Sequence, residues 1–303
     1  DNWKELIGYN DPDGMVSINE CGAMFLNTIN SFDFLKTTTL SMEKAGVPFS
    51  FLDHKETKKK LDKLGFDISQ SFKPSRIEDE SFGKSIETPV YGSLYMPVSG
   101  YISDPSLANS NMQYGAKKRG AEFLFNETVL DILTTRTNYD NDTKKHRVIG
   151  LKTDKNIYYS PIIINCAGVY SSHINNILYN NLDISNDCME TKALRQEVCY
   201  IEAPDSINVK RDGMIICDSD TGVHFRPETG NKFIVGNSEP PCDNFVYENP
   251  DKIDLNFTDQ HRQQLYRACL RIPTLPLYGG KKTGGIVSMY DVTGDWTPVY
   301  DKS

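Results

Sequence analysis

The sequence lacks the long apolar runs that a membrane protein needs. None of its hydrophobic stretches approaches the ~20 consecutive apolar residues that span a bilayer, which argues against a transmembrane role. It also lacks a basic excess, because 33 Lys and Arg stand against 41 Asp and Glu and give a net charge of −8. A nucleic-acid-binding face needs clustered positive charge. We therefore expect neither a nucleic-acid partner nor a membrane span.

Paired cysteine and histidine motifs are missing as well. The seven cysteines are odd in number and scattered, and no C-x-x-C occurs. The five histidines form no H-E-x-x-H and no other paired metal spacing. Scattered single cysteines are typical of reduced thiols in a cytosolic-type compartment. We therefore expect a cytoplasmic protein, and no pattern points to a metal site.

One stretch with a strand-turn-helix pattern organises the rest of the chain. The β-branched run Ile162–Ile164 predicts a short, fully buried strand. It leads into the small residues Ala167 and Gly168, and the serine pair 171–172 can cap a helix that begins near residue 173. Such a turn brings backbone amides close to an anionic ligand in α/β proteins. The alternative is an ordinary buried strand whose glycine only makes a turn.

The remaining chain mixes helix and strand signals in its first half and changes to antiparallel β texture from Asp187. Capping residues followed by apolar periodicity predict helices at 31–46, 53–64, 104–120 and 257–270. Alternating or β-branched runs predict strands at 21–27, 47–52, 121–125, 128–133, 148–153, 157–159, 193–203, 214–217, 223–225, 232–236 and, with a sharp turn, 284–301. The stretch 67–90 is polar and irregular, which is typical of a surface excursion.

Six short motifs follow one another along most of the chain. They are Ser99-Gly-Tyr-Ile-Ser-Asp-Pro105, Gly120-Ala-Glu-Phe with Thr128-Val-Leu-Asp-Ile132, Ile164-Asn-Cys-Ala-Gly-Val-Tyr170, Gly222-Val-His-Phe-Arg-Pro227, Phe233-Ile-Val-Gly-Asn-Ser-Glu239 and Tyr290-Asp-Val-Thr-Gly-Asp295. Each motif is modest, but their order resembles the D-amino-acid-oxidase-type superfamily of FAD-dependent oxidoreductases. The most similar branch holds sarcosine oxidase, dimethylglycine dehydrogenase and related enzymes of N-methyl amino acids.

The resemblance implies a mixed α/β and α+β fold. An incomplete FAD-binding α/β domain of the glutathione-reductase type would interleave with an antiparallel β-sheet substrate domain. In these terms, residues 21–94 would form the first part of the substrate domain with its helices, and 95–180 part of the FAD-binding domain. Residues 181–280 would form the antiparallel substrate sheet, and 281–303 would return toward the FAD domain.

The resemblance also nominates cofactor-binding positions. It implies that backbone groups at Val129 meet the adenine, and that Ala167 and Gly168 approach the adenosine-pyrophosphate part of FAD. Ser288 falls where monomeric sarcosine oxidase carries its flavin on a cysteine, so the resemblance excludes cysteinyl attachment at this position. Val129 alone would be read as a core residue.

Three further residues fall where the family places side chains around the substrate. His224 and Tyr290 would shape and polarise the pocket in front of the flavin, and Arg226 would meet a carboxylate bidentately. Each has a plain structural alternative: a partly buried histidine, a packed tyrosine with its hydroxyl satisfied, and a surface ion pair.

Two departures from the family pattern bear on these expectations. The G-x-G-x-x-G turn that holds the pyrophosphate occurs nowhere in the sequence, and neither does the family's final glycine-rich turn. The sequence therefore looks like the middle of a flavoprotein, with FAD-holding segments and the usual carboxylate-binding residues lying outside it.

The expected function is an FAD-dependent oxidation of the C–N bond of a small N-methyl amino acid, by hydride transfer to the flavin. The substrate is then a small-molecule amine or amino acid, and an electron-acceptor protein or partner subunit remains open. Two alternatives stand: a non-catalytic flavoprotein-like scaffold, and a glycerol-3-phosphate-type dehydrogenase of the same superfamily.

Overall fold

The computed structural model describes residues 3–28, 31–86, 88–102, 104–137, 145–182, 189–277 and 283–300. These residues divide into two compact units. Unit 1 comprises the described residues within 1–121, 197–244 and 255–287, and unit 2 those within 122–196, 245–254 and 288–303.

Several helices of unit 1 begin at a side chain that caps them. The helices of this unit are α1 (Trp3–Ile7), α2 (Phe32–Ala45), α3 (His54–Leu61), α4 (Pro105–Lys118), α6 (Val209–Asp212), α7 (Asp259–Arg271) and the short 3-10 helix η1 (Asp62–Leu64). Asp53 forms the predicted capping box with Glu56 at the start of α3. Asp104 caps α4 and Thr258 caps α7, as predicted. The helix signals at 31–46, 53–64, 104–120 and 257–270 are therefore confirmed.

An eight-stranded mixed sheet lies mostly in unit 1, and residues 192–196 and 288–292 of two of its strands belong to unit 2. Its strand order is β15 (Gly284–Val292), β11 (Lys192–Glu202), β14 (Lys232–Asn237), β13 (Val223–Glu228), β12 (Ile215–Asp218), β2 (Ala23–Asn27), β6 (Gly92–Met96) and β3 (Ser50–Asp53). β12 pairs with β2 in parallel, whereas β13 is antiparallel to both of its neighbours. Two two-stranded sheets accompany it: β1 (Ile18–Glu20) with β7 (Gly100–Ile102), and β4 (Ser71–Phe72) with β5 (Ser85–Ile86).

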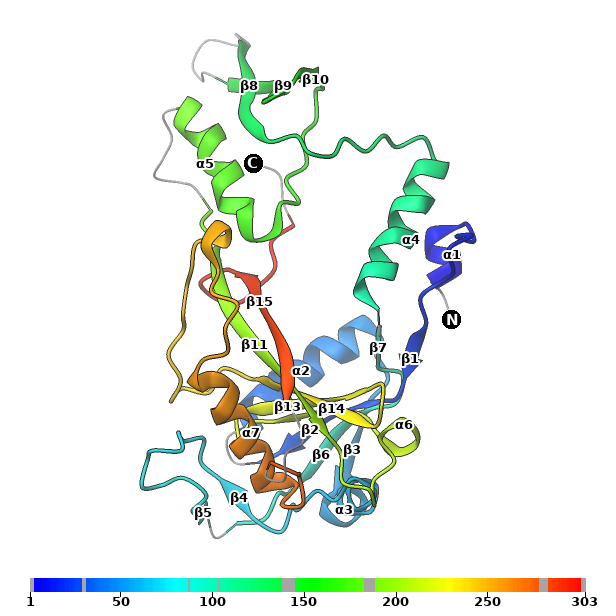
Figure 1. The fold of residues 1–303 in the computed structure, drawn as a ribbon, viewed down its shortest axis with the longest axis vertical. Coiled ribbons are helices and arrows are strands. Elements are labelled where there is room, and N and C mark those ends of the chain that lie inside the picture. The colour runs from blue at the N-terminus through cyan, green and yellow to red at the C-terminus, as the bar shows by residue number, and fades with distance from the viewer. Residues whose placement is uncertain are drawn as a thin grey trace. The chain divides into compact units, whose positions relative to one another are not determined.

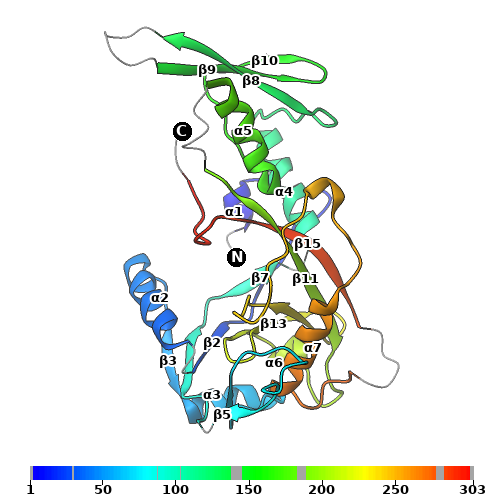
Figure 2. The ribbon, with the colours of Figure 1, turned by 90° about the vertical axis from the view of Figure 1, so that its left-hand side faces the viewer.

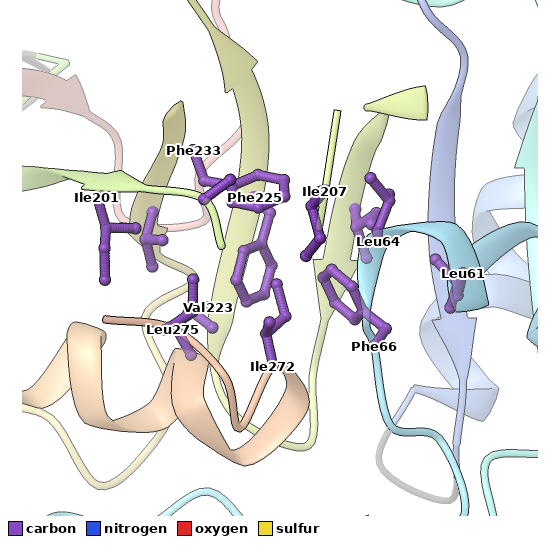
Figure 3. Close-up of a cluster of buried hydrophobic side chains, with 14 of the residues drawn as sticks. Leu61, Leu64, Phe66, Ile201, Ile207, Val223, Phe225, Phe233, Ile272 and Leu275 are labelled. Atoms are coloured by element: carbon purple, nitrogen blue, oxygen red, sulfur yellow. The ribbon is translucent and has the colours of Figure 1, made fainter. Parts of the chain in front are cut away.

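The core of unit 1 lies between one face of this sheet and the helices that cover it, among them α7 beside β13 and β14 (Figure 1). Phe225 stands at its centre, with its ring centroid 4.8 Å from that of Phe66 and 6.2 Å from that of Phe233, both edge-to-face (Figure 3). Ile272, at the end of α7, is also fully buried there. The alternation of β13 thus sends every second side chain into the core and leaves the others on the opposite face.

Helix α7 also buries two arginines. Arg271 is fully buried, and its guanidinium contacts Asp218 at 2.7 Å and Asp220 at 3.1 Å. It donates further to the backbone carbonyl of Gln70 at 2.7 Å. Arg267 donates to the carbonyl of Ser75 at 3.0 Å. Through these bonds α7 holds part of the stretch 67–90, so its interpretation as a mere surface excursion was wrong.

Unit 2 contains a three-stranded antiparallel sheet and a helix. β8 (Val129–Thr137), β9 (Lys145–Thr153) and β10 (Ile157–Tyr159) form the sheet, and α5 (Ser171–Leu182) packs beside β8 (Figure 2). The 3-10 helices η2 (Gly168–Tyr170) and η4 (Pro250–Lys252) complete its regular elements. The predicted hairpin at 148–159 is confirmed as β9 and β10.

Two predicted strands, of which only the one at 162–164 was predicted to be buried, are wrong. Residues 121–125 and 161–167 have no regular secondary structure. Ile162 and Ile164 are 71% and 79% exposed, and Phe125 is 63% exposed. An apolar run becomes a buried strand only where neighbouring strands pair with it and cover it, and no described strand pairs with either segment. The helix after this turn also starts earlier than predicted, at Ser171.

Among the described residues, no helix has the length and apolar character of a membrane span. In the same residues, no group of three or more His, Cys, Asp and Glu side chains is arranged to hold a metal ion.

Candidate substrate-binding face of the large sheet

The polar face of β13 brings together two of the predicted site residues. Val223, Phe225 and Pro227 are buried, whereas the alternate residues His224 and Arg226 are only partly buried. Successive side chains of a strand point to opposite faces, so His224 and Arg226 share the face that turns away from the core. The strand thus positions both groups by a simple period of two.

Arg226 is held from two sides and keeps one donor atom unused. Its Nη2 donates to Glu228 Oε2 at 3.0 Å. Its Cζ lies 4.5 Å from the centroid of the Tyr101 ring, a cation–π distance. Its Nη1 is buried and has no hydrogen-bond partner among the described residues. A buried unpaired donor is costly, so this atom marks a place where a ligand oxygen would be stabilised.

Other ionisable groups surround this arginine. Burial raises the pKa of Tyr101 above its ordinary value, and the positive charge of Arg226 partly opposes the shift. Burial likewise raises the pKa of the Cys21 thiol, again opposed by Arg226. Tyr200 follows the same rule, with Glu228 adding to the rise. At neutral pH these three groups are uncharged, so Arg226 and Glu228 provide the charges of the cluster.

The His224 ring lies against Gly236 of the neighbouring strand β14. In the register of the sheet it stands between Cys217 on β12 and Gly236 on β14. Burial lowers the pKa of His224 below its ordinary 6.5, a hydrogen bond with the backbone of Asn237 opposes this, and the Arg226 charge lowers it further. The imidazole is therefore neutral at neutral pH and can offer one donor and one acceptor.

Gly236 makes room for the His224 ring. A Cβ built on Gly236 would overlap Cε1 and Nε2 of His224. We expect Gly236→Ala to displace the ring and to lower the free energy of unfolding by about 1–3 kcal/mol, the usual range for overpacking. Urea unfolding monitored by circular dichroism measures this change.

A matched substitution and a double variant control that experiment. Gly284 lies near the start of β15 with open space where a Cβ would stand, so Gly284→Ala should leave stability nearly unchanged. In Gly236→Ala/His224→Ala the imidazole is absent and so is the clash. This double variant should therefore be about as stable as His224→Ala alone. An equal cost of Gly236→Ala with and without the imidazole would contradict this account.

The predicted pyrophosphate turn lies in unit 2. Gly168 has φ +56° and open space beside its Cα, so a left-handed backbone explains the glycine. The amide of Ala167 already donates to Asn165 Oδ1 at 3.1 Å. The hydroxyl of Ser172 bonds the backbone of Thr191; hence Ser172 does not cap α5.

The remaining predicted residues also lie in unit 2. Ser288 and Tyr290 are two residues apart on β15 and share an exposed face, with Tyr290 43% exposed. Val129 begins β8, pairs with Thr153 and is partly buried. The structure thus brings His224 and Arg226 together on one strand, and Ser288 and Tyr290 on another.

Sequence comparison identifies the family. Residues 2–303 match the family model "DAO: FAD dependent oxidoreductase". The chain belongs to the DAO family of FAD-dependent oxidoreductases. The family resemblance, the cofactor of the family and the mixed α/β fold predicted from the sequence are thereby confirmed.

Individual relatives of this DAO-family chain are distant. Human mitochondrial sarcosine dehydrogenase is 32% identical over 85 residues, which is 28% of the chain and 9% of that protein. L-proline dehydrogenase from P. horikoshii superimposes with a TM-score of 0.67 at 18% identity, over 100% of this chain and 67% of its own. Glycine oxidase from Bacillus cereus gives 0.60 at 15%, over 98% and 65%. At these identities the structural likeness shows the fold alone, and the chain spans about two-thirds of these structures.

The DAO-family cofactor fits features of unit 2. The open space beside Gly168 lies just before the start of α5, where the helix dipole favours an anion. Val129 contributes an edge of the three-stranded sheet in the same unit. These residues are compatible with contacts to the adenosine and pyrophosphate parts of FAD.

Three residues around His224 and Arg226 were not among the predicted site residues. Glu228 was detectable, because it continues the period-two pattern of His224 and Arg226 by one step. Tyr101 lies within a quoted motif, but its approach to Arg226 is a contact between residues 125 positions apart in the sequence. Gly236 also lies within a motif, and only the sheet register places it beside His224.

Proposed function

We propose that this DAO-family protein is an FAD-dependent oxidoreductase of a small amino acid whose carboxylate is bound by Arg226. The observation that carries the proposal is the buried, unpartnered Nη1 of Arg226 on the polar face of β13. A carboxylate oxygen would pair with this donor and add a charge-assisted hydrogen bond.

The neighbours of Arg226 suit this role. Glu228 and Tyr101 hold the guanidinium on two sides, which limits the side-chain entropy lost when a ligand binds. Glu228 also balances part of the positive charge of Arg226, so the arginine remains paired when no substrate is bound. His224, neutral through burial, would line the same face and hydrogen-bond the substrate without changing the net charge.

FAD, when bound, supplies the acceptor for the hydride that leaves the carbon beside the substrate nitrogen. Val129, Ala167 and Gly168 would contact its adenosine and pyrophosphate parts, and Ser288 would lie near it without a covalent bond. Tyr290 would form part of the substrate wall. The chain's own contribution is orientation of the substrate and exclusion of water from it.

The finer substrate class within this proposal is an N-methyl or other secondary amino acid. Two similarities support it: the sequence similarity to a sarcosine dehydrogenase, and the structural likeness to an L-proline dehydrogenase. Both enzymes are named for amino acids whose nitrogen carries a second carbon substituent. A primary amino acid such as glycine, named for another structural neighbour, is the competing substrate.

Anaerobic reduction of the full-length, FAD-loaded protein tests the proposal. Sarcosine, proline, glycine and glycerol 3-phosphate are added separately, and loss of the flavin absorption band is followed. Bleaching by the secondary amino acids, fastest among the four, is the expected result. Bleaching by glycerol 3-phosphate alone would assign the polyol-phosphate alternative, and a protein that retains no FAD would assign the scaffold.

A further inference from the structure

A second candidate site lies entirely in unit 2. The segment 245–248 runs along β11, with Arg195 N–H donating to the Val246 carbonyl at 2.8 Å and Glu248 N–H to the Ala193 carbonyl at 3.1 Å. This extended pairing places Phe245 and Tyr247, two residues apart, on the same side. Both rings are 47% exposed. The backbone thus presents two aromatic side chains to solvent on a fixed support.

A strained turn adds a third ring. Trp296 has φ +60°, a conformation that costs a bulky residue about 1–3 kcal/mol. Asp295 Oδ1 holds the turn, with the Thr293 hydroxyl and the Thr297 amide each donating to it at 3.0 Å. The turn brings the Trp296 ring to 6.0 Å from Phe245, tilted by 53°.

The three rings form walls of one cavity. The Phe245 ring also lies 6.3 Å from the Tyr247 ring and is tilted by 59° to it. Neither of the two ring pairs is a parallel stack. The cavity has a volume of about 220 Å³, and its remaining lining comes from Glu190, Lys192 and residues 292–294. Lys192 Nζ stands 5.7 Å from the Tyr247 centroid. A cation therefore already occupies the edge of this aromatic surface.

We propose that this aromatic pocket binds an alkylated ammonium group. Ring faces attract cations through their quadrupoles, and tilted rings that surround a cavity are suited to a bulky, weakly hydrated cation. A sodium or potassium ion would lose its hydration without regaining polar ligands from the rings. The Glu190 carboxylate adds attraction, whereas the Lys192 ammonium opposes the ligand.

Tryptophan fluorescence offers a direct readout. The sequence has two tryptophans, Trp3 and Trp296, and Trp3 lies in unit 1 with its indole N–H on Asn111. The Trp3→Phe chain therefore reports on the pocket alone. Titration with tetramethylammonium chloride or choline chloride, at constant total chloride, should change its emission saturably. The readout requires neither FAD nor turnover, so the result is independent of the proposed function.

The neutral carbon analogue of choline, 3,3-dimethyl-1-butanol, separates charge from shape. We expect it to bind at least about tenfold more weakly than choline, because it lacks the cation–π attraction. Equal binding of the two compounds, or no saturable change with either cation, would overturn the proposal.

Variants of the lining residues sharpen the test. Phe245→Leu should weaken tetramethylammonium binding by about tenfold, Glu190→Gln should weaken it, and Lys192→Met should strengthen it. Phe257→Leu is the control, since Phe257 is a similarly exposed phenylalanine of unit 1 at 43%, and it should change nothing. Unchanged affinity in both Phe245→Leu and Glu190→Gln would place the cation elsewhere and reject the pocket.

Discussion

Replacing Arg271 by methionine is expected to lower the free energy of unfolding by about 3–5 kcal/mol, the range for breaking a buried ion pair by removing one partner. The guanidinium contacts Asp218 and Asp220 at 2.7 and 3.1 Å, and all three side chains are at most 1% exposed. Burial alone lowers the pKa of Arg271, but the two aspartates outweigh it and raise the pKa above its ordinary value. Without the arginine, two carboxylates would remain buried and uncompensated.

The effect of Arg271→Met is measured by urea unfolding against a control on the same helix. Arg262 of α7 pairs with Asp259 at 2.8 Å, but its side chain is 61% exposed. Arg262→Met should therefore change stability by less than about 1 kcal/mol. The triple variant Arg271→Met/Asp218→Asn/Asp220→Asn should regain part of the loss, because it removes the buried charges. Equal stability of the two single variants would contradict the assigned role of the Arg271 network.

Replacing Arg226 by methionine is expected to lower kcat/KM for the amino-acid substrate by about 100-fold, equivalent to about 2.7 kcal/mol. The loss should fall mainly on KM, because a carboxylate remote from the reacting bond is bound equally before and during the reaction. The kcat/KM of Arg226→Lys should lie between those of the unaltered protein and Arg226→Met, since lysine keeps the positive charge but lacks the planar guanidinium. Steady-state kinetics with the FAD-loaded protein measures both constants.

A change of substrate distinguishes this role from a structural one. The amide of the same amino acid has no carboxylate, so it should be a poor substrate for the unaltered protein and should lose little in Arg226→Met. Arg211→Met is the control, because the Arg211 side chain is 72% exposed and pairs with Asp212, an arginine–carboxylate pair like that of Arg226 with Glu228. Similar losses of kcat/KM for acid and amide in Arg226→Met would show that the arginine supports the fold and does not bind the carboxylate.

The features predicted best from the sequence are those that form within a few residues of the chain. The capping box at Asp53 and the caps at Asp104 and Thr258 form as predicted, because a cap is made within four residues. The alternation in β13 likewise needs only the strand itself. The family followed from motif order, which carries information no single motif has.

The two predicted strands that do not form show where a local pattern fails as a predictor. Ile162–Ile164 has the composition of a buried strand, yet Ile164 is 79% exposed. A β-branched run records a preference for extended backbone, but burial depends on strands from elsewhere that pair with it. Helix α7 shows the same limit, because its local pattern does not reveal that Arg267 and Arg271 are fully buried.

The sequence by itself determined the fold class, the family, the capped starts of α3, α4 and α7, and the placement of His224 and Arg226 on one strand face. Only the tertiary structure decided that Tyr101 stacks on Arg226, that Gly236 makes room for His224, and that three aromatic rings enclose a pocket at Trp296. The physical reason is range. Dihedral preferences, capping and side-chain periodicity act over a few residues, whereas sheet register and the burial of charge arise only when distant segments meet.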